Sequence, residues 1–162
     1  MINKKRKLSL VLAGVLATVA PSFAAPEGQP VSIQERARGA ARVVVATVVD
    51  TTARYERNEF GDDLIVTHAE LAVDEALKGP RLGATLAIEG GTVNGITLGV
   101  SDLPSIRKGE RAVFFLAPGR DGEFKPHLRG QGILKLDGNN RVPGSSLTLD
   151  EIRRLAGSAG AK

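Results

Sequence analysis

The chain has 162 residues, no cysteine and a formal net charge of +4 at pH 7, from 22 Lys and Arg against 18 Asp and Glu. Four of the basic residues and none of the acidic ones precede residue 25, so the rest of the chain is neutral. A neutral chain without a dense Lys/Arg cluster lacks the basic face that nucleic-acid binding needs. A chain without cysteine also forms no disulfide. We therefore expect no nucleic-acid partner and a domain held together by packing alone.

The first 24 residues carry the parts of a secretory signal in the expected order. Lys4 to Lys7 are basic, residues 8–20 are apolar, and Ser22-Phe23-Ala24 places small residues where signal peptidase cuts. The alternative is a membrane anchor, but the apolar run is shorter than the roughly 20 residues that span a bilayer. We predict a signal peptide at 1–24, export to the periplasm or the medium, and no membrane span after cleavage.

A single domain is predicted for residues 31–156, with a spacer at 25–30 before it and a disordered tail at 157–162 after it. Ser32 and Glu35 have the spacing of a capping box. The Ala- and Arg-rich stretch that follows has no β-branched residue, which predicts a short helix at 34–42. Because aromatic residues are few, we expect Val, Leu, Ile and Ala to fill the core.

Two strands are predicted next. Residues 43–49 form a β-branched run that is typical of a strand covered on both faces. Residues 54–63 are polar and predict a loop. Alternation then predicts a long, half-exposed strand. Its apolar face carries Ile65, Thr67, Ala69, Leu71, Val73 and Leu77, and its other face carries His68, Glu70 and Asp74, so His68 is expected to be solvated.

The glycine-rich stretch EGGTVNGITLGV at 89–100 follows a third predicted strand at 82–89. A phosphate-binding loop would need a following Gly-Lys-Ser/Thr or a strand-to-helix context, and neither is present. Asn94-Gly95 lies between two short β-branched pairs, and these two residues best tolerate the positive φ angles of a type I′ turn. We therefore predict a β-hairpin at 92–98.

The rest of the chain predicts further short strands and one helix. Strands are expected at 111–116, 123–128 and 132–136, with turns at 120–122 and 137–140. Residues 147–156 have helical apolar spacing, with Thr148 as N-cap. Short strands with helices only at the two ends predict a mainly β fold, a small antiparallel OB-like barrel with flanking N- and C-terminal helices. A β-sandwich is the alternative.

No catalytic or metal-binding motif is found. His68 and His127 are not paired with a further ligand at the spacing of a zinc site. In the acidic loop around Asp62, Phe60 occupies a ligand position of the calcium-loop pattern. No Gly-x-Ser-x-Gly motif occurs. We predict no catalytic residue, no metal and no cofactor.

Four blocks resemble a family of small exported bacterial β-domains without an assigned activity. They are VVVATVVD, VDEALKGP, GGTVNGITLGVSDLP and KGERAVFFL, spread over residues 40–136. The resemblance implies an OB-like barrel, distantly like the domains that inhibit metalloproteinases. Those inhibitors bind through a cysteine-anchored N-terminus, which this chain lacks, so inhibition does not carry over. The signature residues are Gly90, Gly91, Thr92, Gly95, Pro104, Gly109 and Glu110, for which we expect structural roles.

These observations favour a non-catalytic exported domain that binds another protein or an envelope polymer. The alternatives are a small hydrolase that uses carboxylates such as Glu70 and Asp74, and a protease-inhibitor-like domain. OB barrels bind ligands on the face of their second and third strands. The protein-binding candidates on and beside that face are Arg57, Asp62, His68, Glu70, Val93 and Ile96. Whether the 92–98 hairpin is exposed or plugs the barrel is left open.

Overall fold

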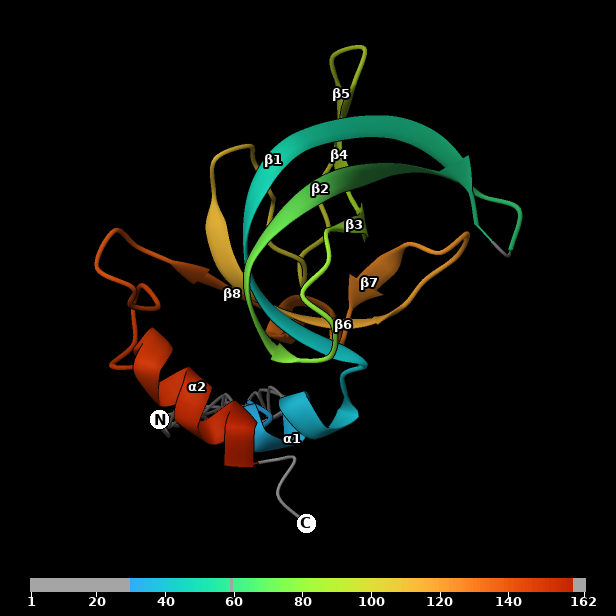
Figure 1. Cartoon of the computed structure of the whole chain (residues 1–162). Coiled ribbons are helices and arrows are strands. Elements are labelled where there is room, and N and C mark those ends of the chain that lie inside the picture. Colours follow the sequence, from blue (N-terminus) through green and yellow to red (C-terminus); the bar gives the residue numbers. More distant parts are fainter. Residues whose placement is uncertain (1–29, 59, 159–162) are drawn as a thin grey trace, which may run out of the picture.

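The computed structural model describes residues 30–58 and 60–158, so the predicted leader, most of the spacer and the end of the tail lie outside the described residues. The elements are α1 (Ile33–Gly39), β1 (Arg42–Arg57), β2 (Asp63–Lys78), β3 (Ala84–Glu89), β4 (Gly91–Val93), β5 (Ile96–Leu98), β6 (Arg111–Pro118), β7 (Phe124–Pro126), a 3-10 helix η1 (Arg129–Gly132), β8 (Ile133–Leu136) and α2 (Leu149–Ser158). The predicted mainly β class with a short helix at each end is confirmed (Figure 1).

Five strands form a ring in the order β1-β2-β3-β7-β6, because β6 pairs back onto β1. All neighbours are antiparallel except β3 and β7, which are parallel. The strand β6 makes the closure because it pairs β1 along one edge and both β7 and β8 along the other. This ring is the small, partly closed barrel that the turn spacing predicted.

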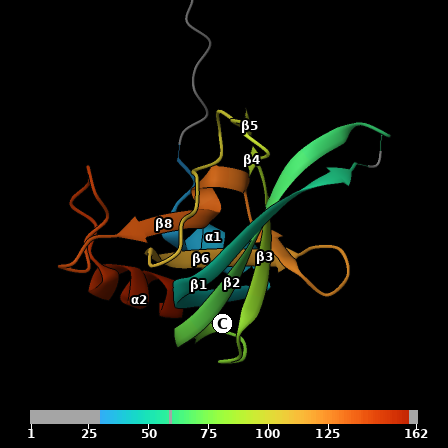
Figure 2. The same cartoon turned by 90° about the horizontal axis from the view of Figure 1, so that it is seen from above.

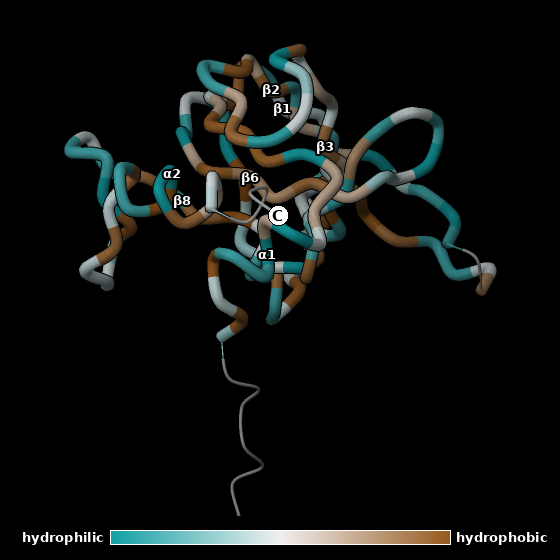
Figure 3. The backbone as a smooth tube through the Cα atoms, turned by 60° about the horizontal axis from the view of Figure 1, so that its bottom comes forward, coloured by the Kyte–Doolittle hydropathy of each residue, from teal (hydrophilic) through white to brown (hydrophobic). Residues whose placement is uncertain are grey.

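Two apolar clusters lie on the two sides of β1 and β6. Val44, Ala46 and Phe114 point into the barrel, whereas Val45 and Phe115 point outward and are covered by α1 and α2. The β-branched run of β1 is therefore buried on both faces, as predicted. In Figure 3 the tube is largely brown where β6 crosses the centre of the molecule. The two Phe residues are the largest buried side chains, so the core is not built from aliphatic residues alone.

The helices are short and their ends are capped by side chains. Ser32 and Glu35 form the complete capping box at the start of α1. That helix ends at Gly39, earlier than predicted. The ammonium group of Lys78 donates to the carbonyl oxygens of Ala37 and Arg38 in its last turn and of Ala40 just after it. The hydroxyl of Thr148 accepts the Glu151 amide, as predicted for α2. This helix continues to Ser158, so residues 157 and 158 are helical and do not belong to a disordered tail.

Strands β1 and β2 are longer than predicted and form an arm beyond the barrel (Figure 2). Residues 54–57 and Asp63 were expected in a loop, but they are paired, and of the described residues only Asn58 and 60–62 lie outside the two strands there. Val49 was expected in the buried run and is exposed. Leu77 was expected on the face of Val73, but it packs with the helices while Val73 packs in the barrel. Bulges in the β1–β2 ladder alter the side-chain alternation at the end of the ladder where β1 begins and β2 ends.

The predicted hairpin is present and is not a plug. Asn94 and Gly95 have φ angles of 50° and 80°, as a type I′ turn requires. Val93 is half-buried, but Ile96 is 60% exposed, and the hairpin projects above the arm in Figure 1. None of the helices within 30–58 and 60–158 is both long enough and apolar enough to cross a membrane.

Candidate functional site

The candidate site is the outer face of β2 and β3, which is the face turned away from the barrel core. Ala69, Leu71, Leu86 and Ile88 point into the core. The alternating residues of the same strands therefore point outward. These include His68, Glu70, Thr85 and Ala87, which we call the outer face. Two acidic residues bind His68. Glu56 lies on the part of β1 that belongs to the arm, and Glu123 lies in the 119–123 loop between β6 and β7.

His68 joins these two regions. Its Nε2 lies 2.7 Å from Oε1 of Glu56 on β1, and its Nδ1 lies 2.9 Å from Oε1 of Glu123. The His68 side chain is only 8% exposed. A ring flanked by two carboxylates donates to both only when both nitrogens carry a proton. The ring therefore bridges the arm and the 119–123 loop through both of its nitrogens.

The Glu56 carboxylate is also bound by Arg54, at 2.7 Å from Nε. Burial raises the pKa of Glu56, but the hydrogen bonds from Arg54 and His68 outweigh burial and hold this pKa below its ordinary value. Glu56 is thus stabilised as an anion. With both of its nitrogens occupied by carboxylates, His68 has no free nitrogen to accept a proton from a substrate in this arrangement.

A pocket of about 310 Å³ opens beside the outer face. Ala87, the cross-strand neighbour of His68, belongs to its lining. The complete lining is Ala87, Ile88, Glu89, Leu103, Ala117, Lys125, Pro126, His127, Leu128 and Arg129. Small alanine side chains from β3 and β6 leave this space open, and charged side chains stand at its margin.

Arg129 holds one margin of the pocket. Its guanidinium binds Asp102 through two nitrogens and Glu89 at 3.2 Å. The hydrogen bond to Asp102 is the main cause of a raised pKa for Arg129, and it lowers the pKa of Asp102 in return. Leu128 and Arg129 both have left-handed backbones, with φ angles of 58° and 53°. Two consecutive non-glycine residues in this region store strain, which the Arg129 ion pairs hold in place.

Lys125 and His127 complete the polar part of the lining. The Lys125 side chain is exposed and takes part in no ion pair among the residues that the structure describes. Burial, followed by repulsion from Lys78, lowers the pKa of His127 below its ordinary value. The His127 ring is directed toward Gly39 of α1, where a Cβ would lie 2.5 Å from Nε2. Lys125 is therefore the exposed cation of the lining that no ion pair among the described residues occupies.

No Phe, Tyr or Trp side chain of the described residues lies on the outer face or in the lining of the pocket. The two His rings there are engaged, His68 by Glu56 and Glu123 and His127 against Gly39 of α1. Phe114 and Phe115 are buried, Phe124 packs in the barrel core and lies beneath Arg42, Tyr55 is on the other side of the arm, and Phe60 is in the 58–62 turn. Faces that bind bases present aromatic platforms for stacking. The described part of the chain offers none here.

The predicted binding residues do not form one surface. Arg57 and Asp62 are exposed at the end of the arm, and Glu70 is exposed on the outer face. The prediction that His68 is solvated is wrong, because Glu56 and Glu123 enclose its ring. Val93 and Ile96 belong to the hairpin, which starts on the side of the arm that faces away from the outer face. The contacts of Gly91, described next, show this.

Gly91 fixes the base of the hairpin. A Cβ on Gly91 would lie 2.4 Å from Oγ1 of Thr67 and 3.2 Å from Cβ of Ala53. Both side chains alternate with those of the outer face, so the hairpin begins on the inner side of the arm. The Thr67 hydroxyl donates to the Gly90 carbonyl at 2.6 Å. This crossing separates Val93 and Ile96 from His68 and Glu70.

The other signature residues have structural contacts. Gly109 and Glu110 bind the backbone of Val48. The Glu110 carboxylate pairs with Lys135 at 2.9 Å. Thr92 pairs with Thr97 across the hairpin at 2.9 Å. Gly95 has a positive φ, and Pro104 lies beside Gly130.

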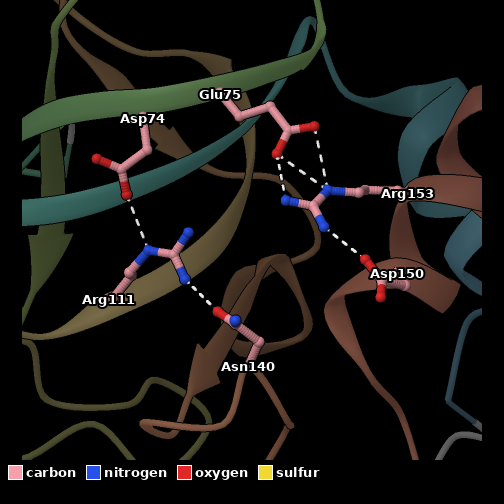
Figure 4. A network of polar contacts seen from close by, with 6 residues as sticks. All are labelled: Asp74, Glu75, Arg111, Asn140, Asp150 and Arg153. Atoms are coloured by element: carbon pink, nitrogen blue, oxygen red, sulfur yellow. Dashed lines mark hydrogen bonds and ion pairs between the residues drawn. The ribbon is translucent and has the colours of Figure 1, made fainter.

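The carboxylates proposed for a hydrolase are not placed together. Asp74 accepts a hydrogen bond of 2.8 Å from Arg111, which also binds Asn140 (Figure 4). Glu70 lies toward the barrel's outer face, and neither Glu70 nor Asp74 lines the pocket. The described residues contain no group of side chains that could hold a metal ion. Glu56 and Glu123 stand at opposite nitrogens of His68, so the three do not converge on one point.

Sequence reasoning missed Glu123, Lys125 and Arg129. They lie far along the chain from His68, and the topology brings them close because β7 pairs with β3. Only the Asp121-Gly122 turn signal pointed to a loop at this position. No family profile matches the chain, and no curated protein matches it.

Proposed function

We propose that this chain is an exported, non-catalytic domain that binds another protein through the outer face and the pocket beside it. The secretory signal at 1–24 and the resemblance to exported bacterial β-domains support export. The OB-type ring supports ligand binding on the face of β2 and β3.

The observation that carries the choice of a protein partner is the absence of Phe, Tyr and Trp side chains from the outer face and the described pocket. Bases and sugars are held on OB faces largely by stacking and need such platforms. An interface with a protein instead combines apolar residues with surrounding charges of both signs. Here the charges are those of Lys125, Glu89 and Glu70, and the apolar residues are Ala87, Leu103 and Leu128.

The hydrolase alternative is less well supported. It requires two carboxylates in different environments that share a cleft. Asp74 is neutralised by Arg111 and lies outside the pocket, and Glu89 inside the pocket is bound by Arg129. The inhibitor-like alternative is one form of protein binding, and identifying the captured partner decides it.

The test is capture of a partner by the mature chain, residues 25–162, from periplasmic extract or culture medium. We compare the wild type with Lys125→Glu, which reverses a charge in the pocket, and with Arg81→Glu, which reverses an exposed charge in the loop between β2 and β3. The captured amount should fall at least about tenfold for Lys125→Glu and change little for Arg81→Glu.

Equal capture by all three chains, or capture no greater than that of an unrelated domain, would contradict the proposal. If the chain instead binds sedimented envelope polysaccharide and no protein, the outer face is a polymer-binding site.

A further inference from the structure

The arm leaves one edge of β1 unpaired. β2 pairs with β1 as far as Arg57, whereas β6 covers only Arg42–Thr47 on the other edge. Val48 is still bound there, by the Gly109 amide and the Glu110 carbonyl. Beyond Val48, no described residue makes a backbone hydrogen bond to that edge. We call residues 49–57 of β1 the free edge.

The ladder shows which groups of the free edge point outward. The Asn58 amide donates to the Asp62 carbonyl at 2.9 Å, and no register shift occurs between Asp50 and Arg57. Bonded and outward residues alternate in an antiparallel pair, so Thr52, Arg54 and Glu56 bond to β2. The outward N–H and C=O groups therefore belong to Thr51, Ala53, Tyr55 and Arg57. The hydrogen bond of the Gly90 amide supports this alternation. It goes to Ile65 at 2.7 Å, on the edge of β2 that faces away from β1, as the alternation requires.

The free edge is only partly protected against further pairing, because it carries the charged residues Asp50, Arg54, Glu56 and Arg57 but no described segment covers it. Proteins blunt exposed edges with Pro, Lys, bulges or a covering segment. Residues 49–57 contain neither Pro nor Lys, and the bulge lies at Val48–Asp50, before the outward row begins. Two of the four residues in the row, Thr51 and Tyr55, are of types that favour strands.

We propose that the free edge takes up an extended segment of the partner protein, which adds a strand beside β1. This mode of binding satisfies the outward groups by main-chain hydrogen bonds and reads the segment through its alternating side chains. One face of the added strand would lie beside Ala53 and Tyr55 and suits apolar residues. The other face would lie beside Arg54 and Glu56 and suits an acidic residue opposite Arg54. The inference rests on the proposed protein partner and says how that partner is held.

The charge pattern disfavours a second copy of this chain as the added strand. Two-fold pairing places the same residues opposite each other in both copies. Centring it on Ala53 sets Asp50 against Glu56, and centring it on Arg54 sets the two Arg54 residues against each other. Directly opposed like charges are destabilising in both of these registers. Centring on Thr52 sets Asp50 against Arg54 instead, so it is the register that a second copy would have to use.

The test uses a synthetic heptapeptide, acetyl-Val-Lys-Val-Glu-Val-Thr-Val-amide, whose Glu falls opposite Arg54 in antiparallel pairing. The control peptide has the same sequence with N-methylated valines, which cannot donate along the ladder. Amide hydrogen exchange of the mature chain is measured with each peptide by NMR. At saturation the amides of Thr51, Ala53 and Tyr55 should exchange at least about tenfold more slowly with the first peptide and be unaffected by the second.

Tyr55→Pro removes one outward amide and leaves the β1–β2 ladder its hydrogen bonds. We expect it to weaken peptide binding at least about tenfold, and Tyr55→Thr, which keeps the amide, less than about threefold. The amide spectrum of β3 and β6 verifies that both variants are folded. Failure of the peptide to protect the outward amides, or equal binding by Tyr55→Pro, overturns the inference.

Two further outcomes separate this inference from the proposed function. A captured partner that is lost with Lys125→Glu but retained with Tyr55→Pro leaves the outer face in place and removes the added strand. A dimer in sedimentation that Tyr55→Pro abolishes would assign the free edge to a second copy and overturn the choice of partner.

Discussion

At the scale of single residues, the bridge through His68 is the feature that most distinguishes this barrel. Its ring is nearly buried, yet it is compatible with the fold because each ring nitrogen has a carboxylate partner. The bridge ties the arm to the 119–123 loop, and these two segments flank the outer face. A residue expected in solvent is therefore part of the frame of the proposed site.

Glu56→Gln tests the bridge through the pH dependence of stability. The folded pKa of Glu56 is below its unfolded value of 4.5, so the unfolded chain binds more protons between the two values. The stabilisation is fully present above about pH 4.5 and is lost as the pH falls through the folded value. A third of the side chain is exposed, so solvent screening limits the effect to about 1 kcal/mol.

Thermal or urea unfolding of the wild type and Glu56→Gln between pH 3 and 7 measures this difference. We expect the variant to be less stable at pH 7 and the two curves to converge at the acidic end, near about pH 3. A difference that stays constant over this range would mean that Glu56 acts through packing and not through charge.

At the scale of elements, the hairpin β4–β5 depends on backbone conformation at its two ends. The base crosses the arm at Gly90 and Gly91, which both have positive φ angles, and the turn uses Asn94 and Gly95. No other atom lies within 4 Å of a Cβ built on Gly95. The requirement for glycine in the turn is therefore conformational and not steric crowding by neighbours.

Gly95→Val should lower the free energy of unfolding by at least about 1 kcal/mol, because a β-branched residue resists positive φ. Gly99→Val is the matched control, since Gly99 also has open space around it but no positive φ. Urea denaturation of both variants measures the effect. If Gly95→Val and Gly99→Val unfold at the same urea concentration, the turn does not constrain the fold.

At the scale of the whole molecule, the local sequence pattern predicted most helices and strands, whereas the contacts between distant segments depend on the topology of the sheet. The run at 43–49 and the alternation from Ile65 to Val73 identified two strands because burial on these faces dictates apolar side chains. The arm was missed because Arg54 to Arg57 are polar on both faces, and such a strand reads as a loop. Glu123 meets His68 only through the closure of the ring, 55 residues along the chain.

The two layers of the molecule, the barrel and the helix pair, are joined by apolar contact and by ion pairs. Ile152 of α2 is fully buried against β1 and β6. The neighbouring Arg153 binds Glu75 of β2 at 2.7 Å and also Asp150, at the surface (Figure 4). Substitutions at Ile152 and Arg153 can separate the apolar contribution to stability from that of the ion pairs, because the two residues are adjacent on one helix and differ in burial.

Ile152→Ala should lower the free energy of unfolding by about 2–4 kcal/mol, because it removes buried methyl groups and leaves a cavity. Arg153→Met keeps much of the side-chain length and removes the charge, and should lower it by no more than about 1 kcal/mol, since both partners of the Glu75 pair are more than a third exposed. The smaller effect should also fade in about 1 M salt, which screens surface charges. Urea unfolding at low and high salt measures both. If Arg153→Met is as destabilising as Ile152→Ala, or its effect persists at high salt, ion pairing and not apolar contact holds α2 on the barrel.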